Sequence, residues 1–577
     1  MIQENRFSKS VLFFMKFMVQ DKKILFFILL LNFAAMIFNI IEPLLAKRIV
    51  DISFSLRNLE ELIIPAGIWG SIYLIRYFVL YLSRKYSLNY NLNVYRKIRL
   101  FLFSNILKKR VSFFQENSPS YIVSRCNGDI ANLDGMLLSN LLLGLLAVLQ
   151  ISVMIVLMMK INIFLTCIVI LLECVILYIQ FAFPLKKLYR EYNEASAEMD
   201  KKVQDTFDCI KLIKSANSNF KEEKYYQNIL EKYTEKRYSR DYFNIIRTIV
   251  TGFSLNFIYP AIIITGGIFV YYDLITVGAI MVYIMYFHKI NILFNEAFAF
   301  IPLYKIACVS ADRLYEIIKA PNEDIVFDEF SHKIQINQPI VWEKVNFAYD
   351  NKKILNDFSL KIYPHKINAV IGVSGAGKST LVNLLMGFIK ADSGNIYING
   401  KNINVYKIND IRSTFALLSQ ESILLQRTVR ENILYYTDEG LVSDARIKEI
   451  LQKAKAEDFV ENLPEKMNYM VAGSGNNFSG GEKQRLCLAR ELLKDAEVYI
   501  FDEATSSLDN LSEQVILHTI KDLARMKTVI MITHKLENTK IADIINVMDD
   551  GRICESGSFD DLIRKKGKYY ALMNNRF

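Results

Sequence analysis

The chain has 577 residues, of which 52% are hydrophobic and 23% are charged, and its formal net charge is +10. This mixture argues against a uniform soluble globule and favours a membrane part joined to a soluble part. The Lys and Arg residues cluster beside apolar stretches, which predicts cytoplasmic loops and no nucleic-acid partner. Seven cysteines without a C-x-x-C pair predict reduced thiols and neither a disulfide framework nor a metal site.

The first half of the chain contains six apolar stretches, each close to the roughly 20 residues that cross a bilayer as a helix. They are 24–46, 59–82, 136–159, 162–183, 246–271 and 277–303. The first stretch is not followed by a small-residue cleavage site, so we expect it to be retained as a transmembrane helix. We therefore predict an N-terminal cytoplasmic segment, 1–23, and an all-α transmembrane domain of six helices, 24–305.

Two connections between these stretches, 83–135 and 184–245, are long, charged and helical in pattern. They are rich in Lys and Arg, which accumulate in cytoplasmic loops. We therefore expect a multi-pass protein of the cell's inner or plasma membrane, with a cytoplasmic soluble domain. A linker, 306–338, leads to residues 339–577, where short β-like runs alternate with amphipathic helices, as in an α/β domain.

A glycine-rich turn in the soluble domain follows the apolar run 367–371 and precedes a helical pattern. It matches G-x-x-x-x-G-K-S, and in this context its backbone amides and the helix N-terminus favour a bound phosphate. Lys378 is expected to reach the β- and γ-phosphates of ATP, and the Ser379 hydroxyl to bind Mg²⁺. The predicted ATP-binding residues of this turn are Gly372, Val373, Ser374, Gly375, Ala376, Gly377, Lys378, Ser379 and Thr380.

Two adjacent carboxylates, Asp502 and Glu503, follow the apolar run Val498-Tyr-Ile-Phe. A strand that ends in Asp-Glu is common, but together with a P-loop it indicates a nucleotide hydrolase. Asp502 is then placed to hold Mg²⁺, and Glu503 to orient or deprotonate an attacking water.

The run Asn477-Phe-Ser479-Gly480-Gly481-Glu482 resembles the signature motif of the ATP-binding cassette (ABC) transporters, Ser-Gly-Gly before a helix. The resemblance implies a P-loop cassette with a helical subdomain at about 421–495, whose signature faces the P-loop of a second cassette. It assigns roles outside the P-loop to the adenine-stacking Tyr349, the Mg²⁺-sensing Gln420, the signature Ser479, Gly480 and Gly481, the D-loop Asp509, and a switch histidine, His534, that is catalytic with Glu503.

This signature departs from the family pattern, with Phe478 and Glu482 where Leu and Gln are usual. The extra carboxylate of Glu482 lies near a site that receives a γ-phosphate, which would slow hydrolysis. It also lies at a helix start, where negative charge is favourable. We expect a mild net effect on hydrolysis.

Charged residues inside the predicted spans are costly unless they face a cavity or a partner. The candidates for a substrate cavity are Lys289, Glu296, Glu173 and Arg76. Lys289 and Glu296 lie about two turns apart, on one face of the sixth helix. Pairing between helices for structural reasons is the alternative interpretation.

The resemblance implies an ATP-driven, exporter-type half-transporter that moves a peptide, lipid or amphiphilic drug by alternating access, with ATP and Mg²⁺ as cofactors. A lipid flippase, an importer built on the exporter fold and an ATP-regulated channel or sensor are the alternatives. Glu503 and His534 are both present, which favours a homodimer of half-transporters in the bilayer, although a heterodimer remains open.

Overall fold

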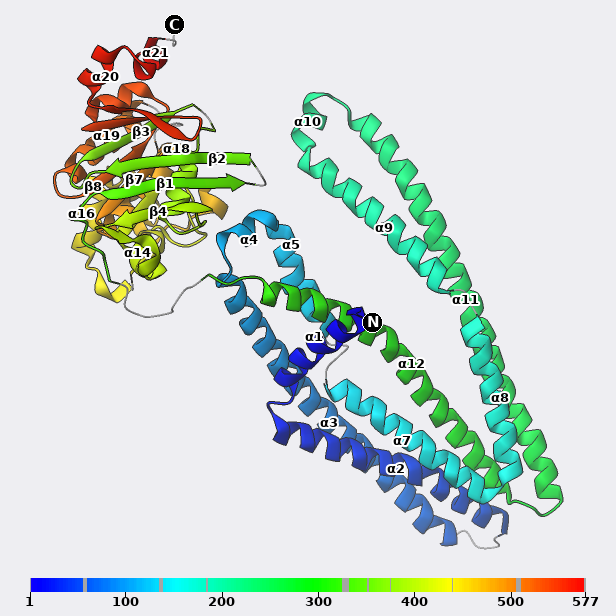
Figure 1. Cartoon of the computed structure of the whole chain (residues 1–577). Helices are drawn as coiled ribbons and strands as arrows, with labels where there is room; N and C mark the ends of the chain where they lie inside the picture. Colours follow the sequence, from blue (N-terminus) through cyan, green and yellow to red (C-terminus); the bar gives the residue numbers. More distant parts are fainter. Residues whose placement is uncertain are drawn as a thin grey trace. The chain divides into compact units, whose positions relative to one another are not determined.

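The computed structural model describes residues 2–55, 60–133, 138–182, 185–323, 332–349, 352–373, 375–437, 439–504 and 510–574. They form two compact units (Figure 1). The first unit comprises Met1–Ser104 and Ile122–Lys319, and the second comprises Asn105–Tyr121 and Ala320–Phe577.

The first unit is built from helices, and each of the six predicted spans corresponds to one long helix. These are α2 (Lys22–Ser55), α3 (Glu60–Leu107), α7 (Leu138–Ile161), α8 (Ile163–Ala182), α11 (Asn219–Tyr271) and α12 (Val277–Lys319). Among the described residues, α2, α3, α7 and α12 contain stretches long and apolar enough to cross a membrane, and α8 and α11 contain shorter apolar stretches. The prediction of an all-α membrane domain is therefore confirmed.

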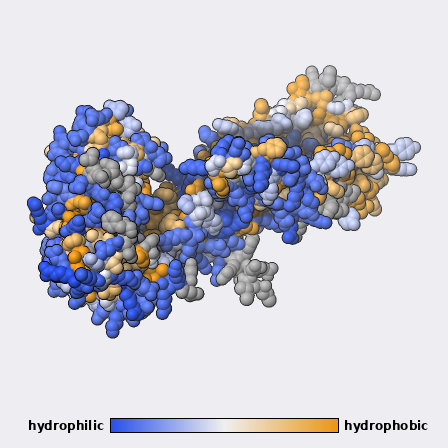
Figure 2. Space-filling view, turned by 90° about the horizontal axis from the view of Figure 1, so that it is seen from above, coloured by the Kyte–Doolittle hydropathy of each residue, from blue (hydrophilic) through white to orange (hydrophobic). Residues whose placement is uncertain are grey.

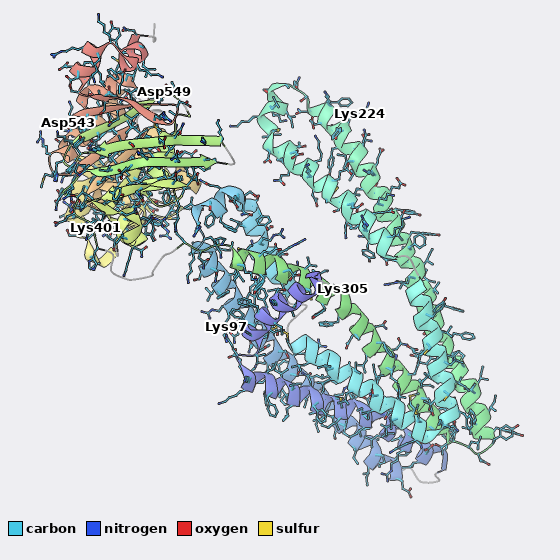
Figure 3. The ribbon with its side chains drawn as sticks, viewed as in Figure 1. Lys97, Lys224, Lys305, Lys401, Asp543 and Asp549 are labelled. Carbon is cyan, nitrogen blue, oxygen red and sulfur yellow. The ribbon has the colours of Figure 1, made fainter. Side chains whose placement is uncertain are left out.

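Several of these helices continue well beyond the apolar stretches. Figure 2 shows apolar side chains gathered toward one end of the helical unit, whereas the visible surface toward its other end is mostly hydrophilic. Charged side chains such as Lys97, Lys224 and Lys305 extend from the hydrophilic parts (Figure 3). The remaining helices of this unit are α1 (Ile2–Met18), η1 (Arg125–Asp129), α6 (Ile130–Asn132), α9 (Leu185–Asp208) and α10 (Ile210–Ser215), and α5 (Pro119–Ser124) has residues in both units.

A buried ion cluster joins three of the membrane helices. The Oε2 atom of Glu42, on α2, lies 2.7 Å from Arg76 Nη1 on α3 and 2.7 Å from Lys289 Nζ on α12. Lys289 also donates a hydrogen bond of 2.7 Å to the carbonyl oxygen of Asn39. At a rise of about 1.5 Å per residue, Lys289 lies about 18 Å from the start of α12, deep within an apolar stretch. The cluster therefore pairs charges where water is scarce.

The second unit contains two β-sheets. An antiparallel sheet has the order β2-β1-β4-β5, and a six-stranded sheet has the order β10-β9-β3-β8-β7-β6. Its strands from β9 to β6 run parallel, and β10 is antiparallel to β9. The strands are β1 (Ile340–Tyr349), β2 (Lys352–Ile362), β3 (Ile367–Gly372), β4 (Ser393–Ile398), β5 (Lys401–Asn402), β6 (Phe415–Leu418), β7 (Val498–Asp502), β8 (Thr528–Ile532), β9 (Ile544–Asp549) and β10 (Arg552–Gly557).

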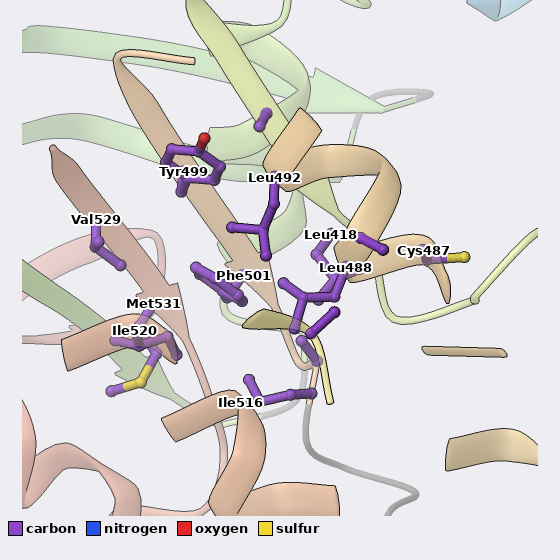
Figure 4. Close-up of a cluster of buried hydrophobic side chains, with 14 of the residues drawn as sticks. Leu418, Cys487, Leu488, Leu492, Tyr499, Phe501, Ile516, Ile520, Val529 and Met531 are labelled. Atoms are coloured by element: carbon purple, nitrogen blue, oxygen red, sulfur yellow. The ribbon is translucent and has the colours of Figure 1, made fainter. Parts of the chain in front are cut away.

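Helices cover the six-stranded sheet, and a helical subdomain is inserted between β6 and β7, as predicted. The main helices of this unit are α4 (Val111–Glu116), α13 (Lys378–Leu385), α14 (Ile408–Thr414), α15 (Val429–Ile433), α16 (Asp444–Lys453), α17 (Glu457–Glu461), α18 (Gly480–Leu493), α19 (Asn510–Ala524), α20 (Phe559–Lys565) and α21 (Lys568–Asn574). Leu488 and Leu492 of α18 and Phe501 of β7 share one buried apolar cluster (Figure 4). This cluster holds the insert against the sheet.

Glu42→Gln should destabilise the helical unit, because it leaves the cations of Arg76 and Lys289 without their shared carboxylate. Removal of one partner from a buried ion pair typically costs about 3–5 kcal/mol. Thermal unfolding of the full chain in detergent would measure the loss. Glu296→Gln is the matched control, since Glu296 is an exposed carboxylate on α12. Equal unfolding temperatures for the two variants would contradict the prediction.

Candidate nucleotide site

The P-loop turn connects β3 to α13 through backbone that favours glycine. Gly375 and Gly377 have φ angles of +83° and +100°. A Cβ atom on Gly372 would lie 2.3 Å from the carbonyl oxygen of Met548, so that position has no room for a side chain. Ser374 lies outside the described residues. The turn thus has the tight backbone that a phosphate cradle requires.

The side chain of Lys378 folds back over this turn. It is 6% exposed, and its Nζ donates hydrogen bonds of 2.9 Å and 3.1 Å to the carbonyl oxygens of Gly372 and Val373. Ala376, Gly377 and Thr380 are buried, whereas Ser379 is exposed. The ammonium and the Ser379 hydroxyl are therefore held at the N-terminus of α13.

Parallel strand order places the other predicted residues at the same edge of the sheet. β3, β8, β7 and β6 are consecutive parallel neighbours, so their carboxyl ends meet at one edge. Asp502 ends β7, while His534 and Gln420 follow β8 and β6 by two residues each. Ligands of open α/β sheets bind at this edge.

The carboxyl group of Asp502 is in an unfavourable environment for a charge. Burial and, to a lesser degree, the neighbouring Glu503 raise its pKa from the ordinary 3.8 to about 6, against the lowering effect of Lys378. A cation bound here would relieve both effects, because it would offset the lost hydration and the repulsion between the two carboxylates.

Glu503 has an unusual backbone conformation for a glutamate, with a φ angle of +49°. Its amide donates a hydrogen bond of 2.9 Å to the carbonyl oxygen of Ile532 in β8. Its Oε2 atom lies 3.5 Å from His534 Nδ1. The left-handed conformation turns the side chain away from the line of β7 and toward the histidine, a kind of strain that is common at functional sites.

The signature residues begin helix α18. The Ser479 side chain caps the helix by accepting a hydrogen bond of 3.3 Å from the amide of Glu482. In return, Glu482 Oε2 accepts bonds of 2.8 Å from both the amide and the hydroxyl of Ser479. The unusual glutamate is therefore one half of a capping box, in which two helix-end donors are satisfied reciprocally.

The other unusual signature residue, Phe478, has a packing role. It is 7% exposed, and its ring lies edge-on to Tyr469 and Phe459 with centroid distances of 6.0 Å and 6.3 Å. A leucine would forfeit these aromatic contacts. On the far side of the motif, Gln484 Nε2 donates to the carbonyl oxygen of Ala504, the residue after Glu503. This bond links α18 to the acidic pair, and sequence reasoning missed it because only the fold brings the two together.

Two of the three remaining predicted residues are accessible to solvent. Tyr349 ends β1 with 37% exposure, which leaves its ring accessible, and it lies edge-on to Phe347. Gln420 is exposed, and Asp509 lies outside the described residues.

The four cavity candidates do not behave alike. Lys289 and Arg76 belong to the ion cluster of Glu42, a residue outside the four candidates. Glu296 is exposed on α12. Glu173 is half-buried on α8, and its Oε2 has no hydrogen-bond partner among the described residues. The pairing interpretation therefore fits Lys289 and Arg76 better than it fits the two glutamates.

Two family models match this chain. The model described as the ABC transporter transmembrane region matches residues 25–293, and the model described as ABC transporter matches residues 355–506. The chain therefore belongs to the ABC transporter family and carries both the transmembrane region and the ATP-binding domain. A bacterial Atm1-family ABC exporter with ATP bound has the same fold, with a TM-score of 0.78 and 22% identity over 96% of this chain and 98% of that chain.

Curated relatives have several transport functions. The mitochondrial ATP-binding cassette sub-family B member 10 of Mus musculus is 28% identical, over 84% of this chain and 69% of that protein. The ATP-dependent lipid A-core flippase of Desulfotalea psychrophila is 27% identical, over 84% of each. The ABC multidrug transporter mdr1 of Aspergillus fumigatus is 40% identical over 44% of this chain, but the match spans only 19% of that longer protein.

Asp502→Asn should stabilise the nucleotide-free protein at neutral pH. The folded chain ionises Asp502 with a pKa of about 6 and the unfolded chain with a pKa of about 3.8, so the folded state carries a penalty above pH 6 that is absent below pH 4. This penalty is on the order of 3 kcal/mol. The unfolding temperature of the variant in EDTA should exceed that of the wild type at pH 7.5, and the difference should shrink as the pH falls toward 4. A gain independent of pH, or equal to that of the exposed control Asp458→Asn, would contradict the assignment.

Proposed function

We propose that this chain is one half of an ATP-driven transporter that exports a peptide, lipid or amphiphilic compound through alternating access. One observation carries the proposal: the P-loop, the Asp502–Glu503 pair, His534 and Gln420 meet at one sheet edge in a chain that also has six long helices with apolar stretches. The relatives support it, since they include a lipid flippase and multidrug transporters.

ATP would bind with its phosphates at the N-terminus of α13, where the P-loop amides and Lys378 meet the negative charge. Its adenine would stack on the accessible ring of Tyr349. The site fits Mg²⁺, which would offset phosphate charge, through oxygen atoms of Asp502, Ser379 and Gln420. The described residues contain no group of three His, Cys, Asp or Glu side chains that could hold a metal alone, and Mg²⁺ commonly uses one or two protein ligands plus phosphate oxygens.

Hydrolysis would depend on Glu503 and His534. The Glu503 carboxylate is turned out of its strand toward the histidine, where it can orient or deprotonate a water that attacks the γ-phosphate. His534 would hold the γ-phosphate in line with that water. One chain would thus supply the groups that act on the attacking water and the γ-phosphate.

A second copy of the chain would complete the site. Ser479, Gly480 and Gly481 form the N-terminus of α18, an anion-binding position that we propose faces the P-loop of the partner. ATP can drive the transporter only as far as it binds the closed pair more tightly than the open pair. A homodimer in the bilayer is the simplest arrangement, because this chain has an intact Glu503 and His534 of its own.

A lipid flippase is the second candidate function. The flippase of Desulfotalea psychrophila aligns with 84% of this chain and 84% of its own length, whereas the multidrug transporter mdr1 aligns mainly with one half of this chain. Reconstituted vesicles distinguish the two: a flippase moves labelled lipid between leaflets, and an exporter moves a soluble amphiphile across the membrane.

Glu503→Gln should abolish most of the ATPase activity of the purified chain in lipid nanodiscs. The amide keeps the size of the side chain but cannot accept a proton, and general-base catalysis contributes on the order of 100-fold or more. Nucleotide binding should persist, which separates lost chemistry from lost folding. Full activity in the variant would reject Glu503 as the catalytic carboxylate. An inactive wild type would indicate that a different partner chain is required.

Glu482→Gln should accelerate hydrolysis modestly, by about two- to fivefold, because the amide retains a capping oxygen but removes a negative charge near the γ-phosphate of the partner's ATP. Electrostatic repulsion is screened by salt, so the difference between wild type and variant should narrow from about 0.05 M to about 0.5 M salt. Steady-state ATPase assays at both concentrations measure this. Slower hydrolysis in the variant would show that the capping box matters more than the charge.

A further inference from the structure

The linker that follows α12 is anchored to a buried lysine. Lys109 is 2% exposed, and its Nζ donates hydrogen bonds of 2.6 Å to the carbonyl oxygen of Ala320 and 2.7 Å to Asn322 Oδ1. The amide of Glu323 donates a bond of 2.7 Å to the carbonyl oxygen of Lys108. A buried ammonium is costly unless it is fully bonded, so these contacts fix the start of the linker firmly.

Glu323, the next linker residue, forms an ion pair with Arg412 on α14. Two guanidinium nitrogens of Arg412 bond to the two carboxylate oxygens of Glu323, and the Nη1–Oε2 distance is 3.0 Å. Arg412 Nε also donates a bond of 3.3 Å to the carbonyl oxygen of Met386, and the guanidinium lies 5.1 Å from the ring centroid of Phe388. A two-pronged pair of this kind fixes orientation as well as distance.

Met386 is the C-cap of α13, the helix that begins at Lys378 and ends at Leu385. At about 1.5 Å per residue, the Arg412 contact lies about 12 Å from the P-loop, at the opposite end of the same helix. A cation at a helix C-terminus also interacts favourably with the negative end of the helix dipole. Arg412 is therefore placed to fix the C-terminal end of α13.

The linker reaches the signature helix in the same way. Lys333 Nζ donates bonds of 3.1 Å and 3.0 Å to the carbonyl oxygens of Lys494 and Asp495, at the C-terminus of α18. Burial lowers the pKa of Lys494, and the nearby cations of Lys333 and Arg412 lower it further, whereas Glu491 raises it. Lys333, Arg412 and Lys494 are therefore close enough to interact. The two helices whose N-termini face phosphates are thus both held at their C-termini by cations.

Hydrogen bonds from linker amides to side chains of α14 also join the two segments. The amide of His332 donates a bond of 2.8 Å to Asp410 Oδ1, and the amide of Ile334 donates one of 2.8 Å to Thr414 Oγ1. α14 leads directly into β6, the strand before Gln420. The described parts of this segment, 320–323 and 332–334, therefore contact the same cassette helix at several points.

We propose that the linker residues 320–323 and 332–334, which we call the linker strap, position the P-loop helix and the signature helix for ATP binding. Glu323 and Lys333 of the strap, and Arg412 of α14, are the positioning residues. The inference rests on the proposed function, in which α13 binds ATP and α18 binds the ATP of the partner. Both helices must be correctly placed in one chain for two ATP molecules to close the pair. If the strap contacts are lost, part of the binding free energy of ATP is used to order the two helices. The measured affinity for ATP is then lower.

The test is a double-mutant cycle on the full chain in nanodiscs with Glu323→Gln, Arg412→Gln and both together. Each single variant should raise the KM for ATP by about five- to tenfold while kcat stays within about twofold, and the double variant should be no worse than either single. Equilibrium binding of ATP in EDTA should weaken in parallel. Glu343→Gln, an exposed carboxylate on β1, is the matched control and should leave both values unchanged.

Lys333→Met tests the α18 end of the strap against Lys361→Met, an exposed lysine on β2. A raised KM is expected only for Lys333→Met. The strap is rejected if the variants lower kcat and the amount of folded protein together while KM stays unchanged. It is also rejected if the effects of Glu323→Gln and Arg412→Gln on KM simply add, or if Lys333→Met has the same KM as its control. A wild type that binds no ATP would reject the proposed function first, and this separates the two failures.

Discussion

Parallel strand order is the constraint on which the nucleotide site depends. The P-loop, the acidic pair, the histidine and Gln420 come from residues 372 to 534, and each follows a different strand. Because β3, β8, β7 and β6 are parallel neighbours, the carboxyl ends of these strands coincide, and groups distant in sequence become neighbours in space. The apolar cluster between α18 and the sheet then fixes the helical insert, and with it Ser479, relative to this edge.

Each of the two units contains buried charged groups, and the two units stabilise these groups in different ways. In the helical unit, one carboxylate, Glu42, is shared by two cations, so each charge has a partner in an apolar setting. In the cassette, Asp502 lies beside a second carboxylate, and its affinity for protons is raised as a result. The first arrangement stabilises helix packing. The second leaves a site that gains by binding a cation, which suits function better than stability.

The sequence predicted the elements that depend on local pattern. Hydrophobic length located six helices, and the glycine spacing located a turn whose φ angles at Gly375 and Gly377 are positive. It could not show that Glu42 joins Arg76 to Lys289, because that depends on how three helices rotate against each other. It placed Glu482 near a phosphate and at a helix start but did not identify the capping box, although its S-x-x-E spacing was visible. The linker contacts involve residues at least 78 positions apart, which no local pattern encodes.

The left-handed backbone of Glu503 has a consequence for how such chains diverge. A glutamate in this conformation is held at a steric cost that Asn, Asp and Gly largely avoid. Under the proposed function, selection for hydrolysis would keep the glutamate. In a lineage whose paired chains need only one working site, that selection would lapse in one of the two chains. Drift at this position should then run toward the residues that the backbone prefers, so a degenerate site would be more stable than its ancestor and hard to revert.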